Sequence, residues 1–325
     1  MKEFNSVLVT GGMGFIGSNF IRYMIKNYPD YSYINFDKLT YAANPDNLKD
    51  LEEKENYEFI KGDICDSEAV WRVMEERDVD AIVHFAAESH VDRAIQSAGE
   101  FIRTNVYGSY VMLQAALKYD IKKFVMISTD EVYGDIPYGR YSKEEDVLLP
   151  RNPYAASKAG ADRLAYSFHE THGLPVVIAR PSNNYGPYQH PEKLIPLFIT
   201  NLLEDKKVPL YGDGQNIRDW LFVEDNCKAL SLLLHKGRDG EVYNIAGENE
   251  KKNIEITLAI LEMLGKDESM IEYVEDRKGH DRRYAMDCSK IKKEVGWKAE
   301  TDFERGLRKT VDWYIKNKDW WKKLK

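Results

Sequence analysis

The first half of the chain alternates short apolar runs with longer stretches in which apolar residues recur at helical spacing. The apolar runs predict strands at Ser6–Thr10, Tyr33–Asp37, Tyr57–Lys61, Ala81–Phe85, Lys123–Ser128 and Pro175–Arg180. The stretches between them predict helices at Phe15–Asn27, Ser67–Arg77, Gly99–Tyr119 and Pro153–His172. Strands that alternate with helices are typical of a parallel sheet with helices on both faces. The pattern therefore predicts an α/β fold with a doubly wound parallel sheet.

The pattern changes after about Tyr185, where Gly, Asn and Asp become frequent and irregular segments separate the helices predicted at Glu192–Glu204 and Ile254–Leu264. We interpret residues 1–182 as the main domain and residues 183–325 as a smaller α/β domain that binds substrate over the strand ends, with an approximate and interleaved boundary. The tail Asn317–Lys325 is expected to form a solvated last helical turn with its tryptophans partly packed.

Composition narrows the class of protein. Hydrophobic residues make up 43% of the 325 residues, which is typical of a packed globular protein, and the net charge of −8 argues against a nucleic-acid binder. Three widely spaced cysteines, Cys65, Cys227 and Cys288, fit a reducing compartment. No apolar run is long enough for a membrane span, and the first predicted strand begins too early to leave room for a signal peptide. We expect a cytoplasmic protein without a metal site.

The first strand runs into Gly11-Gly12-Met13-Gly14-Phe15-Ile16-Gly17 and then into a helix. The glycines fit both GxGxxG and GxxGxxG, spacings that permit a tight turn, close approach of a pyrophosphate and close helix–strand packing. Asp37 ends the second strand, 20 residues after Gly17, where a carboxylate accepts a hydrogen bond from a ribose 2′-hydroxyl and repels a 2′-phosphate. The sequence thus predicts a Rossmann-type site for NAD rather than NADP, although Lys38 beside Asp37 weakens the preference. The alternative is a glycine-rich turn that binds nothing.

Two further strand ends are candidates for the cofactor site. Asp63-Ile64 follows the third strand and is expected beside the adenine, and Phe85-Ala86-Ala87-Glu88-Ser89 follows the fourth and is expected beside the middle of the cofactor. Small residues such as these alanines allow close approach of a ligand, but on their own they indicate packing more often than binding.

Tyr154 and Lys158 lie one helical turn apart, so their side chains share a face. A tyrosine is a poor base at neutral pH, but an adjacent ammonium and a cationic nicotinamide ring would both lower its pKa. The spacing Tyr-x-x-x-Lys also occurs at Tyr57, Tyr119 and Tyr314. Only Tyr154 opens a helix after the strand that ends at Ser128, which makes it the candidate catalytic tyrosine.

That strand ends in Ser128-Thr129-Asp130-Glu131-Val132-Tyr133-Gly134, which places two acids and a hydroxyl side by side. Neighbouring side chains on a regular strand point to opposite faces, so Asp130 and Glu131 reach one ligand only if the pleat breaks there. Gly134 and Pro137 favour such a break. The alternative is a solvated turn, or a helix cap formed by Asp130.

Taken together, Thr129-Asp130-Glu131 and Tyr154-Ala155-Ala156-Ser157-Lys158 resemble the extended short-chain dehydrogenase/reductase superfamily and, within it, the dTDP-glucose 4,6-dehydratase family. The resemblance runs almost from end to end. It includes the blocks that begin at Asp37, Ala86, Asn183, Pro191, Tyr211 and Asp276. Ala43, Ala94 and His190 depart from the family pattern, as does a short loop at Asp135–Arg151.

The resemblance implies a lyase that converts dTDP-glucose to dTDP-4-keto-6-deoxyglucose with a tightly bound NAD that is regenerated in each turnover. It implies that Tyr154, with Thr129 and Lys158, removes the C4 hydroxyl proton as NAD takes the C4 hydride. Glu131 then removes the C5 proton while Asp130 protonates the departing C6 hydroxyl, before the hydride returns to C6. An acid beside a base suits this elimination, because mutual repulsion keeps one carboxyl protonated.

The resemblance also implies binding residues. For the cofactor these are Gly11, Gly14, Phe15, Ile16, Gly17, Asp37, Lys38, Leu39, Thr40, Asp63, Ile64, Phe85, Ala86, Ala87, Ser89, Thr104, Tyr154, Lys158 and Asn184. For the nucleotide-diphosphate hexose they are Glu88, Thr129, Asn183, Lys193, Leu194, Pro209, Leu210, Tyr211, Arg218, Asn253, Arg277 and His280. Arg218 is a physically reasonable choice because a guanidinium suits a diphosphate. A homodimer is implied, joined through the predicted helices Gly99–Tyr119 and Pro153–His172.

Three other functions remain open from sequence. A nucleotide-sugar 4-epimerase would share the fold, NAD and the Tyr154/Lys158 pair, but it needs no acid–base pair for C5 and C6. A 4,6-dehydratase could also act on a GDP-, CDP- or UDP-hexose. A catalytically silent NAD-binding sensor is the third alternative, and the complete set of catalytic residues argues against it.

Overall fold

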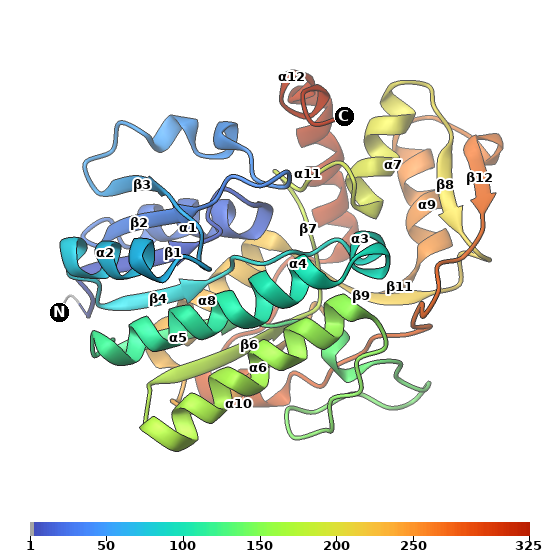
Figure 1. Ribbon diagram of the computed structural model, residues 1–325. Helices are drawn as coiled ribbons and strands as arrows, with labels where there is room; N and C mark the ends of the chain where they lie inside the picture. Colours follow the sequence, from blue (N-terminus) through green and yellow to red (C-terminus); the bar gives the residue numbers. More distant parts are fainter. Residues whose placement is uncertain (1–2) are drawn as a thin grey trace.

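The computed structural model describes residues 3–325, and its centre is a seven-stranded parallel sheet (Figure 1). Its strands are β1 (Ser6–Thr10), β2 (Ser32–Asp37), β3 (Tyr57–Lys61), β4 (Ala81–His84), β5 (Lys123–Ile127), β6 (Val176–Pro181) and β10 (Val242–Ile245). They lie in the order β10-β6-β5-β4-β1-β2-β3. The chain leaves β1 towards β2 and β3 on one side and returns to β4 on the other. Such a reversal leaves a crevice at the carboxyl ends of the central strands.

Both faces of this sheet are covered by helices, as the apolar runs predicted. Helices α2 (Ser67–Arg77), α5 (Ser109–Lys118) and α6 (Pro153–His172) lie in front of the sheet in Figure 1. Helices α1 (Phe15–Asn27), α8 (Val223–Lys236) and α10 (Ser289–Val295) pack on the other face. Successive residues of β1 serve the two faces in turn: Val7 and Val9 belong to the apolar cluster of the second face, and Leu8 belongs to that of the first. The predicted doubly wound fold is therefore confirmed.

The C-terminal part adds two small sheets and a third apolar cluster. One sheet contains β7 (Asn183–Tyr185), β9 (Ile217–Phe222) and β11 (Glu250–Lys252), and the other pairs β8 (Val208–Tyr211) with β12 (Ile271–Val274). Around them lie α7 (Leu194–Leu203), α9 (Asn253–Met263), α11 (Phe303–Lys316) and α12 (Lys318–Lys322). Between β9 and β11 the chain returns to the central sheet as α8 and β10. The division at residue 182 stays a prediction.

The predicted continuous helix Gly99–Tyr119 is wrong in its middle. The structure has α3 (Val91–Gln96), α4 (Gly99–Phe101), a π-helical segment η3 (Ile102–Gly108) and then α5. A π-turn holds one residue more than an α-turn and is frequent at functional sites. Its apolar spacing is nearly that of an α-helix, so the sequence pattern does not reveal it.

The tail is also more ordered than predicted, because Trp320 and Trp321 are buried rather than partly packed. The Trp320 indole donates to Asn47 Oδ1 at 2.9 Å, and the Trp321 indole donates to the Tyr314 carbonyl at 2.9 Å.

The remaining short elements are the 3₁₀ turns η1 (Pro45–Asn47), η2 (Lys49–Leu51), η4 (Asp130–Tyr133) and η5 (Glu268–Met270). Within residues 3–325, none of the helices combines the length and apolarity needed to cross a bilayer.

Candidate active site

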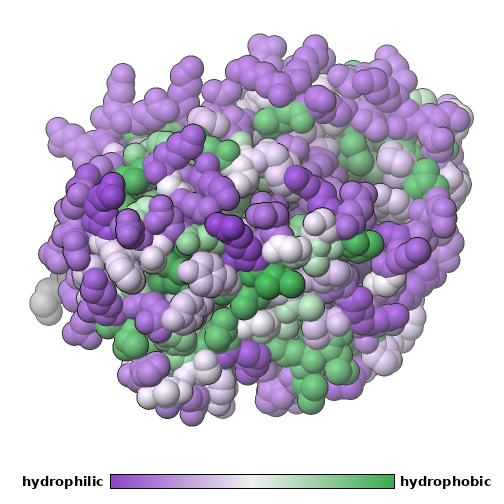
Figure 2. All heavy atoms as spheres, viewed as in Figure 1, coloured by the Kyte–Doolittle hydropathy of each residue, from purple (hydrophilic) through white to green (hydrophobic). Residues whose placement is uncertain are grey.

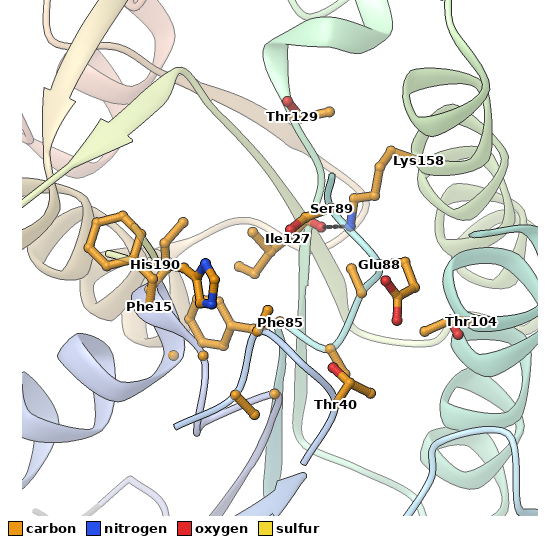
Figure 3. Close-up of a pocket in the computed structure, with 18 of the residues that line it drawn as sticks. Phe15, Thr40, Phe85, Glu88, Ser89, Thr104, Ile127, Thr129, Lys158 and His190 are labelled. Atoms are coloured by element: carbon orange, nitrogen blue, oxygen red, sulfur yellow. Dashed lines mark hydrogen bonds between the residues drawn. The ribbon is translucent and has the colours of Figure 1, made fainter. Parts of the chain in front are cut away.

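One cleft lies at the carboxyl ends of β1, β2, β4, β5 and β6, at the reversal of strand order (Figure 3). Residues after β1 and β2 form one wall, and the loop Phe85–Ser89 and the turn after β5 form another. The segment from Pro181 to Lys193 contributes the side towards the C-terminal part. Figure 3 shows Phe15, Phe85, Glu88, Thr129, Lys158 and His190 around this one space.

The glycine turn after β1 is packed too closely for side chains. Gly11 has φ +72°, and a Cβ there would lie 2.6 Å from the Ala86 nitrogen. A Cβ on Gly17 would lie 2.4 Å from the Gly11 carbonyl oxygen. Helix α1 begins directly after Gly14, which has no side chain to cap the first N–H groups. These N–H groups therefore face the cleft as a ready binding site for a phosphate.

Asp37 lies at the end of β2 with both carboxylate oxygens held by backbone. Oδ2 accepts from the Met13 N–H at 3.0 Å and Oδ1 from the Leu39 N–H at 2.7 Å, so the carboxylate ties the second strand to the glycine turn. Leu39 reaches Asp37 with φ +59°, a conformation uncommon for leucine. Burial raises the pKa of Asp37, while the two N–H donors oppose that rise. Each oxygen retains a lone pair for a hydroxyl donor.

Directly after β5 the chain turns into η4, so the pleat ends before the two acids. Thr129 caps this turn, its hydroxyl accepting from the Glu131 N–H at 3.3 Å and donating to Asp130 Oδ1 at 3.1 Å. The break required for Asp130 and Glu131 to serve one ligand is therefore present.

Asp130 is buried and lines the cleft. Burial, with the nearby Glu131 carboxylate as the second cause, raises the pKa of Asp130 to about 8. Glu131 is less deeply buried, and its Oε2 accepts from Asn152 Nδ2 at 3.2 Å and lies 3.4 Å from the Tyr284 hydroxyl oxygen. At neutral pH Asp130 thus holds a proton beside a group that can accept one.

Tyr154 and Lys158 line the same cleft from the first turns of α6. Lys158 Nζ donates to the carbonyl of Ile127, the last residue of β5, at 2.6 Å, the contact drawn in Figure 3. Burial lowers the pKa of Lys158 to about 8.

The expectation of a lowered tyrosine pKa is not met by the protein alone. Burial raises the pKa of Tyr154 well above its ordinary value, the negative charges of Glu131 and Asp130 raise it further, and only the Thr129 hydroxyl lowers it. The sequence pattern indicates the ammonium of Lys158 one helical turn away, whereas the folded chain also brings the Glu131 and Asp130 carboxyls close to the phenol. A neutral Asp130 removes part of this repulsion.

Several buried polar atoms around the cleft have no hydrogen-bond partner among residues 3–325. They are Ser128 Oγ, Asp130 Oδ2, Ser182 Oγ, Asn183 Oδ1, Asn184 Oδ1 and Gln189 Oε1. An unpaired buried polar group costs about 1–3 kcal/mol, so a cluster of them indicates a place where a polar ligand completes the bonds.

Residues 8–310 match the family described as GDP-mannose 4,6 dehydratase. The chain is 48% identical to the dTDP-glucose 4,6-dehydratase of Shigella flexneri, over 98% of this chain and 95% of that one. The chain belongs to the dTDP-glucose 4,6-dehydratase family of the extended short-chain dehydrogenase/reductases.

Solved members of this family have the same fold. DesIV, a dTDP-glucose 4,6-dehydratase of Streptomyces venezuelae solved with NAD and TYD bound, is 50% identical with a TM-score of 0.96, over 98% of this chain and 100% of that one. The dTDP-glucose 4,6-dehydratase of Bacillus anthracis in complex with NAD is 52% identical with a TM-score of 0.93, over 98% and 99%.

Within this family fold, the structure brings all five predicted catalytic residues to the cleft: Thr129, Asp130, Glu131, Tyr154 and Lys158. Of the predicted cofactor residues, Leu39 alone is not among those that line it. Leu39 instead contributes its N–H to Asp37. The roles of these residues stay predictions.

The predicted substrate residues divide into two groups. Glu88, Thr129, Asn183 and Lys193 line the cleft, whereas Leu194, Pro209, Leu210, Tyr211, Arg218, Asn253, Arg277 and His280 lie outside its lining. The Arg218 guanidinium is buried, donates to the carbonyls of Ile217 and Asp281 at 2.7 and 2.9 Å, and lies over the Tyr284 ring. His280 Nδ1 lies 2.6 Å from Asp276 Oδ1, and burial lowers the pKa of His280 to about 4.

Several further residues that were not predicted from the sequence also line the cleft. They are Phe36, Ala42, Ala43, Gly62, Ile127, Ser128, Pro181, Ser182, Gln189, His190 and Glu192. Phe36, Ile127 and Ser128 lie in the last residues of predicted strands, and Gly62, Pro181 and Ser182 directly follow predicted strands, so their position at a strand end was a signal for them. Gln189 carries no such signal, because its place depends on the Tyr314 hydroxyl of α11, which donates to the Gln189 carbonyl.

Proposed function

We propose that this protein is an NAD-dependent lyase that converts dTDP-glucose to dTDP-4-keto-6-deoxyglucose and water. The observation that carries the proposal is the acid–base pair after β5. A buried Asp130 with a pKa of about 8 stands beside Glu131, in the same cleft as Tyr154 and Lys158. Membership of the dTDP-glucose 4,6-dehydratase family supports the substrate.

The cleft fits NAD. The glycine turn leaves no room for Cβ atoms at Gly11 and Gly17, the uncapped start of α1 suits a pyrophosphate, and Asp37 suits a ribose diol. Lys38 does not offer a free charge to a 2′-phosphate, because its Nζ lies 2.9 Å from Asp63 Oδ2. When bound, NAD supplies the oxidising power by accepting a hydride from sugar C4 and giving it back at C6.

In the first step, Tyr154 accepts the proton of the sugar C4 hydroxyl. Lys158 assists because an ammonium stabilises a phenolate, and Thr129 assists when its hydroxyl proton turns from Asp130 to Tyr154. The protonated state of Asp130 is useful here too, since an ionised Asp130 raises the pKa of Tyr154. The buried site therefore favours oxidation while the acid still holds its proton.

In the second step, the C4 ketone acidifies the C5 proton, and Glu131 removes it. Asp130 gives its proton to the C6 hydroxyl, the C6–O bond breaks, and water leaves as a C5–C6 double bond forms. Once C6 has received the hydride, Glu131 returns its proton to C5, which completes the 4-keto-6-deoxy sugar. Both side chains follow Thr129 on one short turn, which gives acid and base simultaneous access to neighbouring carbons. A 4-epimerase has no use for this pair.

The test is to incubate the purified protein with dTDP-glucose and identify the product by NMR and mass spectrometry. We expect dTDP-4-keto-6-deoxyglucose, whose mass is about 18 Da lower than that of the substrate because one water is lost. Recovery of dTDP-galactose would assign an epimerase instead.

A competition among dTDP-, UDP-, CDP- and GDP-hexoses tests the base preference. Formation of the keto sugar is measured for each, and faster turnover of another nucleotide sugar would reject dTDP-glucose as the substrate.

We further propose a homodimer through η3, α5 and α6. Ile102, Tyr107 and Tyr110 of the first two elements are 57%, 49% and 41% exposed, and Tyr166 of α6 is 37% exposed. Hydrophobic side chains gather on the face where α5 and α6 lie in Figure 1 (Figure 2). In analytical ultracentrifugation, Ile102→Glu with Tyr107→Glu is expected to convert a dimer into a monomer. A monomeric unmodified protein would contradict this proposal.

A further inference from the structure

The side chain of His84, at the end of β4, is buried between two hydroxyls and belongs to none of the catalytic roles above. Its Nδ1 lies 2.7 Å from Thr10 Oγ1 at the end of β1, and its Nε2 lies 3.0 Å from Ser109 Oγ at the start of α5. The ring thus joins the strand that leads into the glycine turn to the helix that follows the π-turn.

The neighbouring groups determine the direction of each hydrogen bond in the series Thr10–His84–Ser109–Asn105. Ser109 has one hydroxyl proton and donates it to the Asn105 carbonyl at 2.6 Å, so its oxygen must accept from His84 Nε2–H. At the other end the Thr10 oxygen accepts from the Ala86 N–H at 3.3 Å, which leaves its proton for His84 Nδ1. A neutral ring protonated on Nε2 satisfies all of these groups at once.

Both ends of this hydrogen-bond series reach the wall of the cleft. Ala86 lies against the glycine turn, since a Cβ on Gly11 would come within 2.6 Å of the Ala86 nitrogen. Asn105 lies inside the π-turn and clamps the backbone of Glu88: its Oδ1 accepts from the Glu88 N–H at 2.8 Å, and its Nδ2 donates to the Glu88 carbonyl at 3.0 Å.

The same Asn105 side chain reaches the catalytic helix. Its Nδ2 also donates to Ser157 Oγ at 2.8 Å, and Ser157 Oγ donates to the Tyr154 carbonyl at 2.7 Å. A continuous set of directed bonds therefore runs from β1 through His84 and the π-turn to the first turn of α6.

We propose that His84 is a positioning residue, a neutral Nε2-protonated bridge that sets the distance between the cofactor wall Ala86–Ser89 and the helix that carries Tyr154 and Lys158. The inference rests on the proposed function, because the distance matters only if hydride transfer occurs in this cleft. Buried imidazole suits the task, since it offers one donor and one acceptor on opposite sides of a rigid ring. Burial also lowers the pKa of His84 to about 3, so the bridge does not change charge at working pH.

A double-mutant cycle tests the bridge. Thr10→Val and Ser109→Ala each remove one end of it, and each is expected to lower kcat about tenfold with little change in KM, since small misplacements of reacting groups slow chemistry strongly. The double variant should be no worse than the poorer single variant, because both changes break one path. Additive losses, about a hundredfold in the double variant, would overturn the proposal. Thr10→Ser keeps the hydroxyl and should keep kcat within about twofold.

Two controls separate positioning from stability. Thr310→Val removes a buried hydroxyl of the same kind, which donates to the Gly306 carbonyl at 2.8 Å within α11, and it should lower Tm without lowering kcat. If Thr10→Val and Ser109→Ala behave like this control, the bridge is only structural. In ¹⁵N NMR the His84 ring should stay neutral with its proton on Nε2 between about pH 5 and 8, and a titrating or Nδ1-protonated ring would refute the assignment.

Failure of the proposed function would look different. An unmodified protein that makes no keto sugar refutes the function, whereas the NMR tautomer remains measurable. An active unmodified protein with an additive cycle refutes the bridge alone.

Discussion

The turn after β5 and the region around Arg218 hold their polar side chains in opposite ways. Asp130 faces the cleft, and its Oδ2 has no hydrogen-bond partner among residues 3–325. The two terminal nitrogens of Arg218, by contrast, donate to the carbonyls of Ile217 and Asp281. The first region is preorganised, and Asp130 Oδ2 is available to form a hydrogen bond with a ligand. In the second region the two terminal nitrogens of Arg218 already have acceptors within the protein, so a ligand that binds this guanidinium must exchange one set of hydrogen bonds for another. Changes in the first region should therefore act on kcat, and changes in the second on KM or on stability.

The largest expected effect comes from the acid–base pair. Asp130→Asn and Glu131→Gln should each slow water loss by about 10²–10⁴-fold, because each removes one proton-transfer partner. Oxidation at C4 should survive, so reduced cofactor should accumulate and be visible by its absorbance. Parent-rate dehydration by both variants would show that this turn is not the chemical centre.

The pH dependence comes next. Because Asp130 must be protonated to act, and its pKa is about 8, elimination should fall about tenfold per pH unit above that value. Lys158 also has a pKa of about 8, so C4 oxidation and water loss should be measured separately in single-turnover experiments. A rate of elimination that stays flat to pH 10 would contradict the assignment of Asp130.

The raised pKa of Asp130 also makes the free energy of unfolding depend on pH. The pKa of Asp130 is raised from 3.8 to about 8, so the folded state binds the extra proton between these values. This group's contribution to the unfolding free energy is full below about pH 4 and is lost as the pH rises through about 8. Asp130→Asn should flatten that part of the stability profile, as measured by urea unfolding.

A smaller effect is expected at Arg218. Arg218→Lys loses the guanidinium fork and should raise KM for dTDP-glucose about tenfold while kcat changes less. A lower Tm with unchanged KM would show that Arg218 only fastens β9 to the segment at Asp281. That outcome would sharpen the contrast between Asp130 and Arg218, because Arg218 would then have a structural role only.

The smallest effect concerns cofactor choice. Asp63→Asn frees Lys38 from its ion pair and should improve NADP binding relative to NAD about two- to fivefold, as expected for a partly exposed charge pair. Isothermal titration with both cofactors measures the ratio. Adding Lys38→Met to Asp63→Asn should cancel the gain, and a gain that persists would locate the effect elsewhere.

The sequence by itself determined the sheet, its helices and the residues at the strand ends. Strands and helices of this fold follow from local periodicity, and parallel strands bring their carboxyl ends to one edge, so Gly11, Asp37, Asp130 and Tyr154 were predictable as neighbours. Family resemblance extended this to the substrate residues, whose roles stay predictions.

Only the tertiary structure decided how far apart and how buried those residues are. The raised pKa of Tyr154 depends first on its burial and then on the charges of Glu131 and Asp130, the π-turn at Ile102–Gly108 has no distinct periodicity, and the burial of Trp321 depends on packing of the tail. Each of these depends on contacts between segments distant in the chain. Desolvation and charge coupling arise only once those segments have met.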